Sequence, residues 1–263
     1  MNRIRAIITK EWREVFKNKF VIFTVSFMPL MITALPLFVL YFAGGSDDFS
    51  GLSSADLPPQ FLPLCGELGG GDCMLYYLVT QFILLFMMVP VIVPMTIASY
   101  SIVGEKTTRT LEPLLATPVS TLEILVGKGL AGVIPAVLTT WGGYLIYAVG
   151  AYLMVDNPAV VSKLFDPLWI IAIFLVGPLL SVMGVSIAVM ISSRVNDPRV
   201  AEQISGIFVL PVVGLLVGQM SGFLLINERF ILWMAVVLAV LDAILFYFAI
   251  QVFQRETILS RWK

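Results

Sequence analysis

The sequence predicts an all-α polytopic membrane protein with six transmembrane helices, formed by a single domain over residues 1–263. Of the 263 residues, 59% are hydrophobic and 13% are charged, and the mean hydropathy is +0.97. A soluble domain of this size could not bury so much apolar surface. The apolar residues form six blocks separated by polar segments. Each block has the ~20 residues that a helix needs to cross the hydrocarbon of a bilayer.

The residue types exclude most catalytic functions. The chain has no histidine and only two cysteines, so Ser-His and Cys-His nucleophiles, imidazole metal sites and zinc or iron–sulfur centres cannot be assembled. No G-x-x-x-x-G-K-[ST] motif is present, so any ATP that drives this protein must bind to another polypeptide. We therefore expect no enzyme activity, no cofactor, no metal and no nucleic-acid partner for this chain.

Residues 1–19 predict a basic amphipathic helix on the cytoplasmic membrane surface. Its apolar positions, at helical spacing, are Ile4, Ile7, Ile8, Trp12, Val15 and Phe16. Its basic positions are Arg3, Arg5, Lys10, Arg13, Lys17 and Lys19. A signal peptide is the alternative, but the apolar run that follows, Phe20–Phe42, has 23 residues and is too long for a signal-peptide core. We predict an uncleaved first span at 20–42.

The segment Ala43–Cys73 predicts an irregular external loop, because it has five acidic residues and no Lys or Arg. Cys65 and Cys73 lie within it, and outside the cytoplasm a disulfide between them is chemically reasonable. Two free thiols in a poorly ordered loop are the alternative.

Met74–Val103 predicts the second span. Pro90 and Pro94 interrupt its backbone ladder and predict a kink or an unwound turn. This kink could serve as a hinge, or it could be a static bend fitted by packing.

A polar segment, Gly104–Lys128, separates the second and third apolar blocks. Thr110 can cap a short helix whose first turn contains Pro113, and Pro118 ends that helix within two turns. Leu111, Leu114 and Leu115 would share one face of this helix. The next residues, Ser120-Thr121-Leu122-Glu123, have the spacing of a capping box and predict the start of another helix.

The run from Glu105 and Lys106 through Thr110–Ser120 (TLEPLLATPVS) resembles the signature of ABC transporter permeases of the second exporter type, and the order of apolar blocks agrees along the whole chain. The resemblance implies that the short helix is a coupling helix, which docks into a separate ATPase that binds ATP and Mg. The residues it assigns to coupling are Glu105, Arg109, Leu111, Glu112, Leu114, Leu115, Thr117 and Pro118. An ordinary polar loop with a solvated helix is the alternative.

The rest of the chain predicts four more spans, at 124–154, 168–193, 204–226 and 231–253. External segments are expected at 155–167 and 227–230, an inner return at 194–203 and a cytoplasmic tail at 254–263. On this layout only Lys163 and Arg229 of the sixteen Lys and Arg residues fall outside the inner segments. The positive-inside rule therefore predicts both termini in the cytoplasm. We expect a multi-pass protein of the cytoplasmic (inner) membrane of a prokaryote.

Two features of the later spans are candidate pathway or packing sites. Asp242 is the only charged residue predicted deep within a span; it could bind a cation, a proton or cargo, or could tie the sixth span to a neighbour. Gly214, Gly218 and Gly222 form a small-residue stripe that suits a contact between permeases or packing within the chain, and Gln219 beside it is a candidate cavity-lining group. The resemblance also implies that the second and fifth spans line the path, and that Asn227 and Glu228 help to close its outer side.

The predicted function is the permease subunit of an ATP-driven exporter. Two copies, or one copy and a related permease, would pair with two ATPase subunits and export a hydrophobic or amphipathic cargo, such as a drug, peptide or lipid-like molecule, or an ion. The alternative is an ion-driven secondary transporter or channel that works without an ATPase, for which one intramembrane acid is thin support.

Overall fold

A computed structural model of the chain describes residues 2–45, 58–66, 68, 70–108 and 119–252. All regular elements in these ranges are helical, and they include six helical runs long and apolar enough to cross a membrane. This confirms the predicted all-α, multi-pass fold. The α-helices are α1 (Asn2–Val15), α2 (Lys19–Gly45), α4 (Leu62–Cys65), α5 (Gly70–Phe86), α6 (Val89–Thr107), α8 (Thr121–Met154), α9 (Pro158–Ser162), α10 (Pro167–Ile171), α11 (Gly177–Ser192), α12 (Pro198–Gly206), α13 (Leu210–Met220) and α14 (Glu228–Val252).

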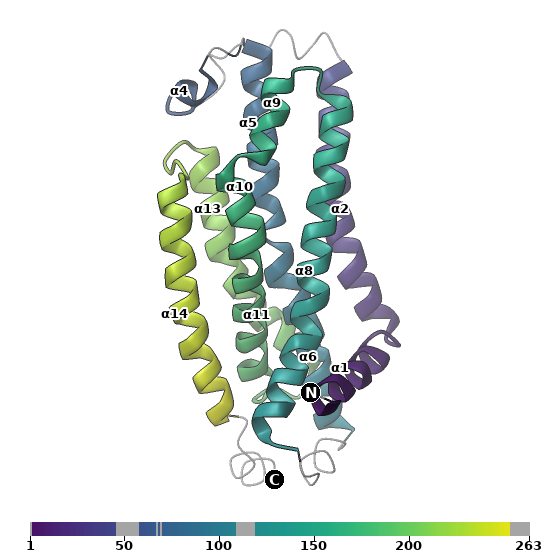
Figure 1. Ribbon diagram of the computed structural model, residues 1–263. Coiled ribbons are helices and arrows are strands. Elements are labelled where there is room, and N and C mark those ends of the chain that lie inside the picture. Colours follow the sequence, from purple (N-terminus) through teal and green to yellow (C-terminus); the bar gives the residue numbers. More distant parts are fainter. Residues whose placement is uncertain (1, 46–57, 67, 69, 109–118, 253–263) are drawn as a thin grey trace.

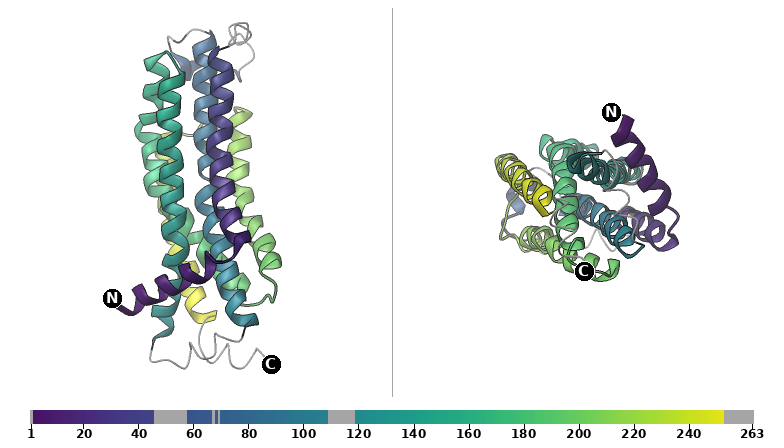
Figure 2. Two further views of the ribbon diagram at one scale, coloured as in Figure 1. Left: turned by 90° about the vertical axis from the view of Figure 1, so that its right-hand side faces the viewer. Right: turned by 90° about the horizontal axis from the view of Figure 1, so that it is seen from below.

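The long helices form an elongated bundle, with α1 lying across one end of it (Figure 1). We call this the α1 end, and we call the other end, which carries α4 and α9, the disulfide end. Seen from the side, α1 projects outward at a steep angle to the bundle, and the view along the bundle shows it lying over the outside of the other helices (Figure 2). The α1 end therefore holds the first helix of the chain beside the ends of α6 and the beginning of α8.

The α6 helix is the centre of the bundle and packs closely against α8 and α11. Close approach is possible because glycines face it: a Cβ on Gly184 of α11 would lie 3.0 Å from the carbonyl oxygen of Val91 and 3.3 Å from Cγ of Pro94. A Cβ on Gly132 of α8 would lie 3.1 Å from Cγ2 of Val185. Small residues at helix contacts let backbones approach in this way.

The predicted second span is not one helix. The α5 helix ends at Phe86, and α6 begins at Val89 after a turn at Met87 and Met88. The cause is Pro90, which occupies the first turn of α6, where its missing N–H is tolerated. Pro94 lies inside α6, and its ring packs beside Gly184. The packing of the Pro94 ring fits the interpretation of this proline as a static bend. The break between α5 and α6 lies before Pro90.

The helix ends differ from the predicted segment bounds at three places. Part of the predicted external segment 155–167 is helical, since α9 begins at Pro158 and a 3-10 turn follows at Lys163–Phe165. The fifth run begins at Pro198, inside the predicted inner return, and ends at Met220. The connection to α14 consists of residues 221–227, so the predicted turn 227–230 is mostly the first turn of α14.

Asx–Pro pairs explain two of these helix starts. Asn157 accepts a hydrogen bond from the backbone N–H of Ala159 at 2.9 Å, and Asp197 accepts one from the backbone N–H of Arg199 at 2.8 Å. In both cases a proline follows the capping residue, and its fixed φ suits the first helical position.

The fourth run contains an irregular stretch. Residues Ala172–Val176 form a π-helix between α10 and α11. Trp141 of α8 donates its indole N–H to the carbonyl oxygen of Ile173 in this stretch, at 3.3 Å. Such π-helical turns are rare in proteins, and those that occur often lie at functional sites. This one faces an apolar cavity described below.

Candidate functional site

The α1 end contains a cluster of buried charges, which we call the buried charge cluster. Its centre is Lys128 of α8, whose side chain is 2% exposed. The ammonium lies 2.7 Å from Oε1 of Glu11 on α1 and 2.7 Å from Oε2 of Glu105 on α6. Both glutamates are as deeply buried as the lysine. One lysine therefore joins α1 to α6 and α8, two helices that come much later in the sequence.

Two further residues complete the hydrogen bonding of the buried charge cluster. Ser101 of α6 donates to Glu11 and lies 2.9 Å from Nζ of Lys128. Lys10 of α1 donates to the other oxygen of Glu105. Among the described residues, two carboxylates therefore face two ammonium groups, those of the buried Lys128 and the part-exposed Lys10. Burying charges is tolerated only with such pairing and hydrogen bonding.

Lys10 is charged at neutral pH. Partial burial favours its neutral form, but the hydrogen bond to Glu105 and the nearby charges of Glu105, Glu11 and Glu14 outweigh burial and raise the pKa of Lys10 above its ordinary value. Lys10 also lies 3.6 Å from Glu14 on the outer face of α1.

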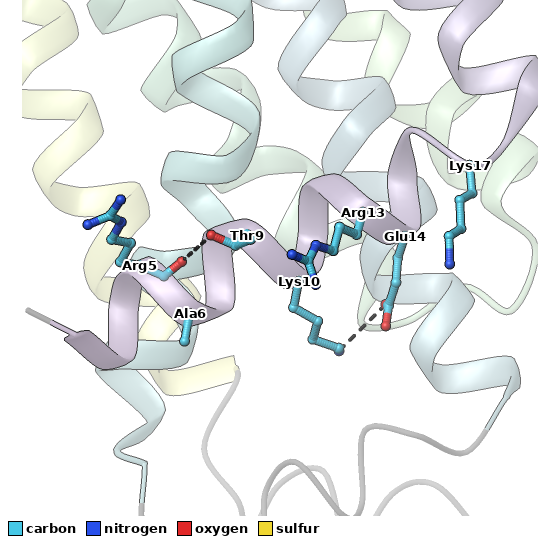
Figure 3. Close-up of a pocket in the computed structure, with 7 residues that line it drawn as sticks. All are labelled: Arg5, Ala6, Thr9, Lys10, Arg13, Glu14 and Lys17. Atoms are coloured by element: carbon cyan, nitrogen blue, oxygen red, sulfur yellow. Dashed lines mark hydrogen bonds and ion pairs between the residues drawn. The ribbon is translucent and has the colours of Figure 1, made fainter.

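The outer face of α1 is predominantly basic and borders a shallow cavity of about 690 Å³. Figure 3 shows the side chains that line it and the ion pair between Lys10 and Glu14. The basic residues among them are Arg5, Lys10, Arg13 and Lys17. The opposite face of the helix is buried through Ile7, Glu11 and Val15. The structure thus has the amphipathic N-terminal helix that the sequence pattern predicts.

Close packing holds α1 against α8. Trp12 donates its indole N–H to the carbonyl oxygen of Ala131 at 2.9 Å. A Cβ on Gly127 would lie 2.7 Å from Cγ2 of Ile7, nearer than real Cβ atoms approach. Gly127 therefore leaves the space that Ile7 fills, directly beside Lys128.

The predicted coupling segment lies between α6 and α8, two of the three helices that the buried charge cluster joins. The coupling residues Arg109, Leu111, Glu112, Leu114, Leu115, Thr117 and Pro118 lie outside the described residues. Glu105 is described, and its side chain is 3% exposed and held by Lys10 and Lys128. The Glu105 carboxylate therefore fixes the base of the segment, and its predicted role in coupling stays a prediction.

The helices on both sides of this segment have defined ends. The predicted capping box is confirmed: the backbone N–H of Glu123 donates to Oγ of Ser120 at 3.2 Å, and the backbone N–H of Ser120 donates to Oε2 of Glu123 at 2.8 Å. On the other side, Lys106 donates to the carbonyl oxygens of Ser193 and Val195, at 3.3 Å and 3.2 Å, in the connection between α11 and α12. The end of α6 is therefore held by α1, by α8 and by the connection between α11 and α12.

The glycines predicted to form a stripe have different surroundings. A Cβ on Gly218 would lie 2.8 Å from Cδ1 of Leu224, a residue of the turn that follows α13. Gly222, with a φ of 72°, allows the chain to reverse there, and a Cβ on it would lie 2.7 Å from Oε1 of Gln60. A Cβ on Gly214 would meet no atom within 4 Å. Gly218 and Gly222 thus serve packing within the chain.

Two glutamines have buried amide atoms without hydrogen-bond partners among the described residues. Oε1 of Gln219 is one of them, and Gln219 lines a cavity of about 560 Å³ at the disulfide end, next to Asn227 and Glu228. Gln81 of α5 has neither amide atom paired. An unpaired buried amide costs free energy, so it commonly marks a site for water or a ligand.

Asp242 lies on the buried stripe of α14, the helix that packs chiefly against α11. Its side chain is 7% exposed, and neither carboxylate oxygen accepts a hydrogen bond from a described residue. The cation, cargo and structural interpretations of this residue all remain predictions. It lies far along the sequence from the buried charge cluster and takes no part in that cluster.

At the disulfide end, Cys65 and Cys73 form a disulfide, with Cα atoms 5.3 Å apart. The bond ties the short helix α4 to the first turn of α5. Nearby, Asn157 at the start of α9 donates to Asp72 at 2.7 Å. These contacts shape the disulfide end of the bundle.

Sequence reasoning missed the buried charge cluster, although one signal pointed to it. Glu11 falls on the apolar stripe of α1, between Ile7 and Val15 at four-residue spacing. An acidic residue on a face that packs against a membrane-spanning helix requires a buried cation. Lys128, between two glycines at the start of an apolar run, is the residue that fits.

A protein-family model described as ABC-2 family transporter protein matches residues 5–231. The matched range includes all the residues of the buried charge cluster and the segment whose sequence resembles the permease signature. A search of curated proteins found no match. Because the family match covers most of the chain, this protein belongs to the ABC-2 family of transporter proteins and is a membrane-spanning permease subunit of an ABC transporter.

Proposed function

We propose that this permease couples ATP hydrolysis by a separate ATPase to the efflux of a hydrophobic or amphipathic cargo. Members of the family typically pair with an ATP-binding cassette ATPase. ATP and Mg would bind in that partner, and residues 109–118 would contact it. Two permease chains above two ATPase subunits would form the complete transporter, with the pathway between the permeases.

The observation that carries this proposal is the Glu105–Lys128 ion pair at the base of the coupling segment. It joins the end of α6 to the beginning of α8, the two helices between which the segment runs. A force on the segment would reach both helices together, since a buried ion pair resists separation. Glu11 and Lys106 would pass the same motion to α1 and to the connection before α12.

The mechanism would be a rigid-body change driven by the ATPase pair. Closure of the ATPase dimer would bring the two coupling segments together, and the helices attached to each segment would follow. Packed helix bundles switch between discrete arrangements in this way. An inward-open pathway would thus convert to an outward-open one without any chemistry in the permease.

The charge distribution supports an orientation with the α1 end in the cytoplasm. Among the described residues, only Lys163 and Arg229 of the basic side chains lie toward the disulfide end. By the positive-inside rule, this distribution supports the proposal that α1 lies at the cytoplasmic surface of a prokaryotic inner membrane. Its basic outer face would contact anionic lipid head groups there.

The test is the Leu114→Asp variant, reconstituted in vesicles with the ATPase that co-purifies with the wild-type chain. A charge on the apolar face of the coupling segment should lower cargo-stimulated ATP hydrolysis at least tenfold, while the variant still inserts in the membrane. Leu62→Asp, at an exposed position of the disulfide end, is the matched control and should leave stimulation unchanged. Full stimulation with Leu114→Asp would overturn the assigned coupling role.

A second candidate function, ion-driven transport without an ATPase, is favoured by the buried and unpaired carboxyl group of Asp242. It predicts that the purified chain alone moves cargo along an ion gradient and that Asp242→Asn abolishes this movement. Vesicles containing only this chain, with and without a sodium or proton gradient, provide the measurement. No gradient-dependent uptake in the wild type would reject this function.

A further inference from the structure

Two cavities of different chemistry adjoin near the disulfide end. The first, which we call the polar cavity, has a volume of about 560 Å³, and the charged residues that line it are Lys163, Asp166, Glu228 and Arg229. The second, the apolar cavity, has a volume of about 460 Å³ and lies among α5, α11, α13 and α14. Trp169 and Ile226 line both. Each volume is within the ~300–1,000 Å³ range of small-molecule sites.

The polar cavity offers both signs of charge to a ligand. Lys163 and Asp166 pair with each other at 3.6 Å, whereas no ion pair within the described part of the chain involves Glu228 or Arg229. An adjacent acid and base at the rim suit a head group that itself carries an ammonium and an anion.

A buried amide points to the same ligand. Gln219 lines the polar cavity and is 5% exposed, yet its Oε1 accepts no hydrogen bond from any described residue. A buried acceptor without a donor is costly, and a ligand N–H group would satisfy it. An ammonium head group supplies such donors.

The lining of the apolar cavity includes exposed apolar side chains. Phe208 and Leu241 line it and are 42% and 41% exposed, so it borders the surface that faces the bilayer. Its lining is otherwise aliphatic or aromatic, including Met183, Leu215 and Met234. A hydrocarbon chain could therefore enter from the membrane without passing a polar barrier.

We propose that the two cavities together bind one zwitterionic phospholipid of the phosphatidylethanolamine type. Its head group occupies the polar cavity, and one acyl chain lies in the apolar cavity. This arrangement has the orientation of a lipid in the adjacent leaflet, with the head at the end of the bundle and the chain toward the middle. The inference depends only on the cavities and holds whether or not an ATPase drives the chain.

The head group must provide the selectivity of this site. A chain that leaves the bilayer for the apolar cavity exchanges one apolar environment for another, so its transfer discriminates little between lipids. Glu228, Arg229 and the Gln219 amide differ in their fit to zwitterionic and anionic head groups. The site should therefore prefer phosphatidylethanolamine to phosphatidylglycerol with the same chains.

The experiment is photo-crosslinking of the full chain in nanodiscs of phosphatidylglycerol, with a diazirine-chain phosphatidylethanolamine or phosphatidylglycerol tracer. We expect the phosphatidylethanolamine tracer to label peptides of α11, α13 and α14 at least fivefold more strongly. Excess unlabelled phosphatidylethanolamine should displace it. Equal labelling by the two tracers, or labelling spread over the exposed faces of α2 and α8, would overturn the proposal.

Two pairs of variants separate the head-group and chain sites. The double change Glu228→Gln with Arg229→Gln should reduce the preference between tracers to less than twofold, whereas Asp156→Asn, an exposed acid outside the cavity lining, should preserve it. Met234→Trp should fill the apolar cavity and lower labelling at least fivefold. Val237→Trp, on the exposed face of the same helix, should not. An unchanged tracer preference in the double variant would contradict the head-group site, and unchanged labelling in Met234→Trp would contradict the chain site. If a variant fails to fold, the comparison of the two tracers on the wild-type chain decides the proposal.

Discussion

Lys128 is the residue on which the α1 end depends most. Its ammonium holds the carboxylates of Glu11 and Glu105, and each of the three side chains is almost fully buried. The net contribution of a buried ion pair to stability is small or negative, because desolvation offsets attraction. Loss of one partner is different, because it leaves an uncompensated charge in the interior.

We therefore predict that Lys128→Met lowers the free energy of unfolding by about 3–5 kcal/mol. Thermal unfolding of the detergent-solubilised chain, followed by tryptophan fluorescence, measures this effect. Lys163→Met breaks the surface pair with Asp166 and should change stability by less than about 1 kcal/mol. A loss no larger for Lys128→Met than for Lys163→Met would show that the buried charge cluster does not hold the helices together.

Neutralising the partners should restore part of the lost stability. In a variant with Lys128→Met, Glu11→Gln and Glu105→Gln, the interior has no unpaired anion, and Lys10 keeps Glu14 as its partner. We expect this triple variant to unfold at a higher temperature than Lys128→Met alone. Equal unfolding temperatures would mean that lost packing, rather than stranded charge, explains the single variant.

At the scale of elements, α1 packs against α8 at a glycine, where the absence of a side chain makes close contact possible. Gly127 of α8 lets Ile7 approach so closely that a Cβ would overlap it. Gly142, on the same helix, has no atom within 4 Å of a built Cβ. The two glycines therefore form a matched pair for testing how α1 docks.

We predict that Gly127→Ala loosens α1, while Gly142→Ala raises the stability of α8 by about 0.5–1 kcal/mol through its better helix propensity. Hydrogen exchange of the α1 amides, measured by mass spectrometry, should become at least tenfold faster in Gly127→Ala and stay unchanged in Gly142→Ala. Unchanged α1 exchange in both variants would contradict the close contact.

The sequence was sufficient for the number and order of the spanning helices, because hydrophobic length dominates that choice. It was less successful at helix ends, where the capping side chains of Asn157 and Asp197 start helices several residues before the apolar blocks begin. Those Asx–Pro pairs are visible in the sequence, so the error came from giving hydropathy more weight than capping. The two prolines correctly predicted an interruption of the second span, but the interruption lies just before Pro90 and not at the prolines themselves.

The site was harder to predict than the fold for a physical reason. The buried charge cluster joins α1 to residues that lie 90 to 117 positions later in the chain, and no local pattern encodes such pairing. The coupling role of the segment could be proposed from its own residues, whereas the contact between Glu105 and Lys128 at its base required the packed structure. The polar and apolar cavities likewise depend on which faces of four helices meet.

At the scale of the whole molecule, the distribution of basic residues predicts which end of the bundle is accessible from outside the cell. Both native cysteines are in the disulfide, so an introduced cysteine would be the one free thiol among the described residues. We expect Asp156→Cys to react with a membrane-impermeant maleimide in intact cells and Lys17→Cys to react only after the membrane is permeabilised. The reverse pattern would invert the proposed orientation.

The separation between Glu11 and Lys128 also constrains how the protein is made. Glu11 is synthesised 117 residues before Lys128, the buried lysine with which it pairs. At about 5–20 residues per second, this interval is on the order of ten seconds. During that time the first helix must wait at the lipid–water boundary with a hydrated carboxylate. The docking of α1 on the later helices is therefore a late step of biogenesis, because it requires that the third membrane-spanning segment has been synthesised and placed.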